Sequence, residues 1–485
     1  MKFKITKISL LSLLLFTACD KYLEVDPDNR AILNSPQAAR ELLATAYPQA
    51  SYVMMSESMS DNFTDKGPFG GSVVNAVNRD VYKFIENIQS NTEDSPEFYW
   101  AACYKAIAAA NQTLKYIEEQ KDAKALLPYK GEALLCRAYA HFMLSVFFAR
   151  PYNDVNPEAN PGIPYVTEVE DVVIKKYDRG NVKELYEKIQ TDLETGIPLI
   201  NDDAIANTDA TSYHFTRRSA QAFATRFYLF KKDYEAVKKY SKLVFPGNDI
   251  ISNSIRDIVK YKVLPYYVLE QIWSSTSEPT NLLMATAPSQ INGYPFLRYG
   301  ANGAFATAFM WKTPPIPSTT YAWNLYGQEN LYNIPKFRSY SFNQKNYNIA
   351  ILLTADEVLF NWAEASIETG DYAKALELFN LYLKKKLTTS RTSVPNLTED
   401  QLKEAFKTGS TTLRYDYYIA GLLDFKRREF AFEGMRWLDM IRHRIPVHHI
   451  VQDEAAPVVV GANDPRRILQ IPLEVQMSGV ERNLR

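Results

Sequence analysis

The sequence predicts a mainly α-helical protein, in which irregular helical hairpins form a scaffold and a loop-rich subdomain carries a few short strands. Apolar residues recur at the three- and four-residue spacing of amphipathic helices through most of the chain. Residues 246–348 are instead rich in Pro, Asn, Ser, Thr and rings, and short apolar runs such as 270–273 are expected to form small strands. We therefore expect one domain over 36–485, with the scaffold at about 36–245 and 349–485 and the loop-rich subdomain at about 246–348.

Length and charge narrow the classes of function. The chain has 485 residues, enough to bury a large core, and its 55 basic residues balance 56 acidic ones. A protein that binds nucleic acid usually has a basic excess, so we expect no nucleic-acid partner. The 32 Tyr, 25 Phe and 6 Trp residues suit a helical core, and they also suit surfaces that are both apolar and hydrogen-bonding.

The N-terminus predicts export and lipidation. Lys2, Lys4 and Lys7 precede an apolar run at 8–16 that is too short for a mature membrane span and is typical of a signal peptide. Phe-Thr-Ala then leads into Cys19, as in a lipoprotein signal box. We expect residues 1–18 to be the signal peptide and residues 19–35 to be the lipidated Cys19 with its polar tether. The alternative is an ordinary secretory signal in which Cys19 is incidental.

The first half of the body predicts helices at 36–55, 97–120, 129–150 and 181–200, the last capped by Asn181. The intervening 56–91 is polar and rich in Gly and Asn, and a loop of that length is often functional. Alanines in 97–120 allow close approach of 129–150, as in a tetratricopeptide-type hairpin. Cys103 and Cys136 fall at different heights on that hairpin, so we expect two free, buried cysteines.

The second half predicts two further hairpins. One pairs 216–230 with 233–244, and the other pairs 350–369 with 371–386. In the second, Gly370 is placed to end a helix and Asp371 to cap the next one, as in a tetratricopeptide turn. About four such hairpins would make up the scaffold.

The stretch 422–444, LLDFKRREFAFEGMRWLDMIRHR, predicts two short helices joined at a corner at Gly434. Leu422, Phe425, Glu429 and Phe432 fall on one helical stripe, and Trp437 starts a second apolar face. A carboxylate among aromatic residues needs a partner. We expect Glu429 and Glu433 to pair with the nearby Arg427, Arg428 and Arg436, and we prefer this ion-pair cluster to an acid/base pair of catalytic carboxylates.

The same stretch resembles the C-terminal signature of the SusD/RagB family. Further similarities occur in order along the chain: a Leu-acidic-x-x-Pro segment after Cys19, Arg179-Gly180-x-Val182, a pattern from Glu357 to Asn380, and Ile-Pro-x-Glu at 471–474 followed by Asn483. The Asn-Pro-Gly-Tyr ending that is frequent in the family is missing. The resemblance implies an outer-membrane lipoprotein, facing the cell exterior, that captures a glycan or another nutrient for a TonB-dependent (SusC-like) transporter.

The resemblance also implies that ligand contacts come from the early loop and the middle segment. Rings on loops over a rigid scaffold suit carbohydrates, because the C–H faces of a sugar stack on aromatic rings and its hydroxyls bind polar side chains. The candidate ligand-binding residues are Asn62, Phe69, Tyr294, Arg298, Trp311, Trp323 and Tyr326.

Catalytic and metal-binding patterns are weak. The five histidines have no Cys or carboxylate at a recognised spacing, and the chain has neither a Gly-x-Ser-x-Gly elbow nor a phosphate-binding Gly loop. We therefore expect a binding protein and no enzyme, with no cofactor and no metal. Two alternatives stay open: a peptide as cargo in the same uptake system, or a tetratricopeptide-type protein scaffold, which predicts buried rings in 246–348.

Overall fold

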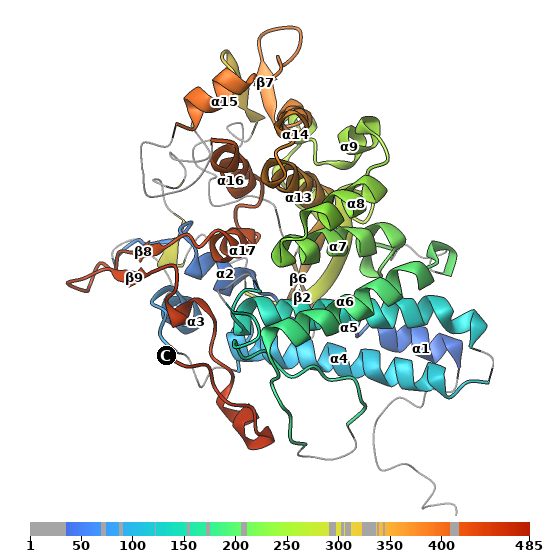
Figure 1. Ribbon diagram of the computed structural model, residues 1–485. Helices are drawn as coiled ribbons and strands as arrows, with labels where there is room; N and C mark the ends of the chain where they lie inside the picture. The colour runs from blue at the N-terminus through green and yellow to red at the C-terminus, as the bar shows by residue number, and fades with distance from the viewer. Residues whose placement is uncertain are drawn as a thin grey trace, which may run out of the picture.

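The fold is mainly α-helical, as predicted, with helical hairpins packed side by side and a small sheet between them (Figure 1). The computed structural model describes residues 35–68, 74–86, 91–121, 123–152, 156–170, 175–204, 211–290, 297–301, 305, 312–322, 336, 339–342, 345–407 and 417–485. Across these residues, no helix combines the length and the apolar character needed to cross a membrane.

The first hairpin is formed as predicted by α4 (Pro96–Glu118) and α5 (Leu127–Phe148). Helix α6 (Val182–Gly196) lies along α5, and Asn181 caps it by accepting a hydrogen bond from the Glu184 amide. Cys103 and Cys136 are free and buried, which confirms the prediction for them. Short 3-10 turns connect these helices: η2 (Lys124–Leu126), η3 (Ile197–Leu199), η4 (Asp202–Ala204) and η5 (Thr211–Tyr213).

The predicted continuous helix at 36–55 is wrong. Helix α1 (Pro36–Leu43) ends early, and α2 (Val53–Met59) starts anew after a turn that contains Pro48. Proline lacks the backbone N–H and clashes with the carbonyl four residues earlier, so it separates the two helices. The early loop that follows contains β1 (Thr64–Asp65) and α3 (Ala76–Tyr82).

The two later hairpins are also present. One pairs α7 (Arg217–Lys231) with α8 (Tyr234–Val244), and the other pairs α13 (Ala355–Glu368) with α14 (Tyr372–Lys384). Helix α13 packs against both α8 and α14. Gly370 has φ +79° and Asp371 caps α14, as predicted. The helix predicted from residue 350 is too long, because 345–354 form strand β6 (Lys345–Thr354) and Thr354 caps α13. A short apolar run does not distinguish a buried strand from a helix.

The middle segment contains more regular structure than predicted. It holds α9 (Asn248–Ser254), α10 (Ile258–Tyr261) and α11 (Tyr266–Trp273), then an antiparallel sheet in the order β2 (Asn281–Pro288), β6, β5 (Ser339–Phe342). The strand expected at 270–273 is wrong, because these residues end α11. Leu269 and Trp273 are buried whereas Gln271 between them is exposed, which suits one turn of a helix, because in a strand all three side chains would lie on the same face.

Two small strand pairs connect distant parts of the chain. Strand β1 pairs with β3 (Tyr299–Gly300), and β4 (Thr319–Tyr321) pairs with β7 (Leu387–Thr389). The C-terminal part comprises α15 (Glu399–Ala405), α16 (Tyr417–Glu429), α17 (Met435–Arg442), β8 (Val447–His449), β9 (Val458–Val460), η10 (Pro465–Arg467) and η11 (Leu473–Ser478). Figure 1 shows α2, α3 and the β8–β9 hairpin gathered at one end of the helical block, beside α17.

Candidate functional site

The predicted corner at Gly434 is present and joins α16 to α17. Gly434 has φ +75°, a left-handed conformation that residues with a side chain rarely adopt. A Cβ atom at this position would lie 3.1 Å from both Ser56 and Tyr52, so the early part of the chain packs directly on the corner. The helical stripe predicted from Leu422 to Phe432 is shorter than expected. Helix α16 ends at Glu429, and Phe432 lies beyond it with φ +68°.

The predicted Arg–Glu pairs are wrong, although the cluster is structural as expected. Glu429 pairs with Lys386 at 2.9 Å, and Glu433 pairs with Lys336 at 2.7 Å. Residues one or two positions apart on a helix point in different directions, so Arg427 and Arg428 do not face Glu429. Both carboxylates therefore take lysines from distant segments as partners.

The arginines of the signature take aspartates instead. Arg436 holds Asp61 of the early loop through two hydrogen bonds of 2.8 Å, and Arg428 pairs with Asp424 at 2.9 Å. Burial opposes ionisation of Asp61, but Arg436 and then Arg427 outweigh that effect and lower its pKa to about 2. Trp437 is fully buried, with its ring centroid 6.0 Å from that of Phe84.

Asn62 lies within this cluster. Its amide nitrogen donates to Glu57 at 2.8 Å, and its amide oxygen accepts from Arg427 at 2.6 Å. The other Glu57 oxygen accepts from the Gly434 amide at 2.8 Å. Burial raises the pKa of Glu57 to about 7, although both of these donors oppose the rise. Asn62 is only 3% exposed, so a ligand contact by Asn62 stays a prediction that requires an exchange of these bonds.

Arg298 ties three segments together. It binds Asp65 of the early loop through bonds of 2.7 and 2.8 Å, and it binds Asp453 after β8 at 2.6 Å. Asp65 also accepts from the amides of Gly67 and Gln452. Arg298 thus positions the early loop against the middle segment and the C-terminal hairpin, and its ligand contact also stays a prediction.

The remaining candidates lie outside the described residues: Phe69, Tyr294, Trp311, Trp323, Tyr326 and the lipidation residue Cys19. The rings of the middle segment that the structure describes are divided between core and surface. Tyr261, Trp273, Tyr299 and Tyr321 are buried, whereas Tyr267, Tyr340 and Phe342 are exposed.

The β5–β6 hairpin carries a surface of rings that the sequence analysis did not select. Tyr340 is 44% exposed and Phe342 is 61% exposed, on the edge strand of the sheet. Tyr340 lies opposite Tyr347 in register, and the two rings stack with centroids 5.6 Å apart and planes 16° apart. Phe342 follows on the same face, two residues along the strand. We refer to Tyr340, Phe342 and Tyr347 as the aromatic hairpin.

The aromatic hairpin combines apolar ring faces with a polar surround. On the opposite face of the strands, Ser341 donates to Asn346 at 2.7 Å. The signal in the sequence was the alternation of rings with Ser and Asn in Tyr-Ser-Phe at 340–342 and Asn-Tyr-Asn at 346–348, which is the period of a strand. Such a surface suits a ligand that offers flat C–H faces and hydroxyl groups.

Further along β6, the ring-bearing face continues through Ile349 to Ile351, which packs against a small apolar cluster to which α10 and α11 contribute. Tyr267 on α11 is 65% exposed. No group of three or more His, Cys, Asp or Glu side chains suited to a metal ion occurs in the part of the chain that the structure describes.

Comparisons with known proteins assign the chain to a family. Residues 21–229 match a family model described as "Starch-binding associating with outer membrane", and residues 303–468 match the model of the SusD family. A search of curated protein sequences gives no match. The two family matches lie in chain order and include the signature corner.

Solved structures of SusD proteins share the fold over nearly their whole length. A SusD superfamily protein from Bacteroides thetaiotaomicron is 16% identical, with a TM-score of 0.68 over 93% of this chain and 100% of its own. A SusD-like carbohydrate binding protein from Bacteroides vulgatus is 14% identical, with a TM-score of 0.57 over 92% and 96% of the two chains. A laminarin binding SusD-like protein is 15% identical, with a TM-score of 0.55 over 92% and 98%. Since both family models match and this fold agrees with theirs, the chain belongs to the SusD/RagB family.

Proposed function

We propose that the protein binds an oligosaccharide or polysaccharide at the cell surface and delivers it to a partner TonB-dependent (SusC-like) transporter. The observation that carries the proposal is the aromatic hairpin, an exposed stacked ring surface on the scaffold of a nutrient-binding family. The names of two similar structures, a carbohydrate binding protein and a laminarin binding protein, agree with a glycan as cargo.

In this proposal the rings and the buried charges have different roles. Tyr340 and Phe342 stack on the sugar, together with Trp311, Trp323, Tyr326 and Tyr294 of the same segment and Phe69 of the early loop. Asn62 and Arg298 hold the early loop in place through Glu57, Arg427 and Asp65, because their polar atoms are already engaged there. A ligand that needs only stacking and hydrogen bonds requires no metal, cofactor or catalytic residue.

The membrane part of the proposal concerns the N-terminus. Lipid chains on Cys19 would anchor the protein to the outer membrane, facing the exterior, with 20–35 as tether and 36–485 as one binding domain. Lipid anchoring contributes about 0.8 kcal/mol per buried CH₂ group. The helical hairpins at 36–245 and 349–485 would face the transporter, and the segment at 246–348 would hold the ligand.

The test is calorimetric titration of the chain from residue 20 onward against a panel of polysaccharides and peptides. Tyr340→Ala should weaken glycan binding about 3- to 10-fold, because an aromatic contact contributes about 0.5–1.5 kcal/mol beyond area burial. Removal of Phe342 as well should weaken it further, as should Trp311→Ala or Trp323→Ala. Circular dichroism should show unchanged helicity in each variant.

Tyr372→Ala is the matched control, since Tyr372 on α14 is 41% exposed and Tyr340 is 44% exposed. Equal losses in Tyr340→Ala and Tyr372→Ala would remove the aromatic hairpin from the proposal. Binding to peptides and to no glycan would favour peptide uptake instead. Binding to neither, with a protein partner found, would favour the scaffold alternative.

A further inference from the structure

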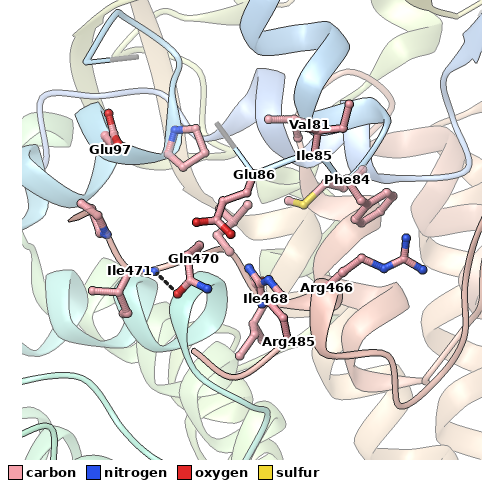
Figure 2. Close-up of a pocket in the computed structure, with 14 residues that line it drawn as sticks. Val81, Phe84, Ile85, Glu86, Glu97, Arg466, Ile468, Gln470, Ile471 and Arg485 are labelled. Carbon is pink, nitrogen blue, oxygen red and sulfur yellow. Dashed lines mark hydrogen bonds between the residues drawn. The ribbon is translucent and has the colours of Figure 1, made fainter. Parts of the chain in front are cut away.

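The C-terminal segment lines two cavities that differ in size and charge, and Ile468 belongs to both. Figure 2 shows the smaller one, of about 50 Å³, which lies between the end of α3, the start of α4 and the C-terminal segment. Most of its lining is apolar, and its charges are balanced, with two acidic side chains (Glu86, Glu97) and two basic ones (Arg466, Arg485). Pockets that hold a ligand usually measure about 300–1,000 Å³, so this cavity is too small for a sugar.

The larger cavity, which we call the basic groove, has a volume of about 820 Å³ and opens to solvent. The loop between α5 and α6 forms one wall and residues 479–484 form the other, and a bond from the Tyr177 amide to the Ser478 carbonyl joins the two. Its volume lies in the range of ligand pockets. Its charged side chains are four basic ones, Arg150, Lys176, Arg179 and Arg482, and two acidic ones, Asp178 and Glu481.

Arg179 is the buried cation of the basic groove. It is 9% exposed, and it donates to three neutral oxygens: the Gly162 carbonyl at 2.8 Å, the Glu481 carbonyl at 2.9 Å and the Asn483 side chain at 2.7 Å. These bonds use three of the five N–H groups of the guanidinium. No carboxylate in the described part of the chain forms an ion pair with Arg179. Burial lowers the pKa of Arg179, although Tyr104 and Glu481 oppose the shift.

Two other buried arginines show what Arg179 lacks. Arg226 holds the carboxylate of Glu357 through two hydrogen bonds, of 2.5 and 2.6 Å. The side chain of Arg256 donates to neutral oxygens, as that of Arg179 does, but its guanidinium lies 3.7 Å from the centre of the Trp273 ring. A buried charge without a compensating partner is costly, so an anion bound in the basic groove would lower that cost.

Lys176 is a second cation of the basic groove that has a neutral partner. It is exposed, and its ammonium group donates to the Met477 carbonyl at 2.8 Å. The neighbouring Lys175 differs, because it pairs with Glu168 at 2.6 Å and does not line the groove. The two acidic side chains of the groove are exposed, so water screens their charges more than that of Arg179. The groove therefore favours an anion over a cation.

We propose that the basic groove binds an acidic saccharide, whose carboxylate or sulfate group pairs with Arg179 and Lys176. An inorganic anion would leave most of the cavity empty, whereas sugar rings fill it. The ring of Tyr177 and the amide of Asn160, which also line the groove, provide an apolar face and a hydrogen-bonding group for such rings. The inference rests on the proposed function for the class of ligand, a sugar, and it concerns a site that no residue of the aromatic hairpin lines.

Calorimetry with trigalacturonate and its neutral methyl ester tests the proposal on the chain from residue 20 onward. The acidic trisaccharide should bind at least about tenfold more tightly, and Arg179→Gln should abolish that preference. Lys176→Gln should weaken binding of trigalacturonate about 2- to 5-fold, because an exposed ion pair contributes less than a buried one. Glu481→Gln should strengthen it by a similar factor, because it removes a negative charge from the groove. A folding defect cannot produce such a gain, so the test remains valid if Arg179→Gln does not fold.

Lys175→Gln is the matched control, since it removes the same charge from the adjacent residue outside the groove, and it should leave both affinities unchanged. Equal affinity for the two trisaccharides, no binding of trigalacturonate, weaker binding in Glu481→Gln, or equal losses in Lys175→Gln and Lys176→Gln would each overturn the proposal. Binding of trigalacturonate without binding of any neutral glycan would support the basic groove and contradict the site at the aromatic hairpin.

Discussion

Lys386 has no exposed surface and lies between two buried carboxylates, Asp356 at 3.1 Å and Glu429 at 2.9 Å. It also donates to the Arg256 carbonyl at 2.8 Å. Lys386→Met keeps most of the side-chain volume and leaves both carboxylates without their cation. We expect a loss of about 3–5 kcal/mol in the free energy of unfolding, measured by urea denaturation at pH 7.5.

The adjacent Lys385 is the matched control. Its pair with Asp257 at 3.0 Å is partly exposed, 21% and 17% for the two side chains. Lys385→Met should cost about 1 kcal/mol or less. The loss in free energy of unfolding caused by Lys386→Met should also be smaller at pH 4, because the carboxylates of Asp356 and Glu429 can then bind protons in the folded variant. A deficit that is equal for both variants, or equal at both pH values, would contradict the assignment of Lys386 as the cation of the cluster.

At the scale of elements, two glycines with a left-handed backbone can be compared: Gly434 between α16 and α17, and Gly370 between α13 and α14. Gly434 and Gly370 have φ of +75° and +79°. A Cβ atom at Gly434 would lie 3.1 Å from both Ser56 and Tyr52, whereas a Cβ atom at Gly370 would meet nothing within 4 Å. Gly370→Ala should cost about 1 kcal/mol for the backbone alone. Gly434→Ala should cost about 2–4 kcal/mol, because overpacking adds to the backbone cost. Urea denaturation of the two variants measures the difference, and equal costs would show that the early segment does not press on the corner.

At the scale of the whole molecule, Asp94 joins the start of α4 to the end of the central sheet. Its carboxylate accepts from the Ser289 hydroxyl at 2.6 Å and the Gln290 amide at 2.8 Å, and Asp94 is 1% exposed. Burial raises the pKa of Asp94 to about 6, against the effect of these two donors. A raised pKa in the folded state means that the contribution of Asp94 to stability is full below about pH 4 and is lost as pH rises through 6.

Asp94→Asn should therefore change the pH dependence of stability. Asparagine tolerates the φ of +67° at this position and can keep both hydrogen bonds. Relative to the natural chain, the variant should gain up to about 3 kcal/mol in the free energy of unfolding between pH 4 and pH 7.5. Parallel stability curves for the two proteins over that range would show that Asp94 does not titrate as inferred.

Much of the scaffold could be predicted because its signals are local. Asn181 and Asp371 cap helices within three residues of themselves, and Gly434 turns the chain where its neighbours are helical. The predictions that were wrong concern segments where local patterns are ambiguous. The apolar run at 349–353 suits a strand or a helix, and its pairing with β2 decides for the strand.

The candidate site could be predicted only in part. Tyr340 and Phe342 of the middle segment are exposed on one face of the β5–β6 hairpin, and sequence spacing does not reveal which face of a strand reaches solvent. Asn62 and Arg298 were selected as polar residues for a ligand, and the structure engages both in bonds to residues far away in the chain.

The sequence by itself determined the helical hairpins, the corner at Gly434 and the resemblance to a nutrient-binding family, because caps, turns and apolar spacing depend on near neighbours. The tertiary structure decided which charges pair and which rings reach solvent. Lys386 reaches Glu429 across 43 positions, and Arg436 reaches Asp61 across 375. Contacts over such separations depend on the packing of whole elements, so the residue types alone do not specify them.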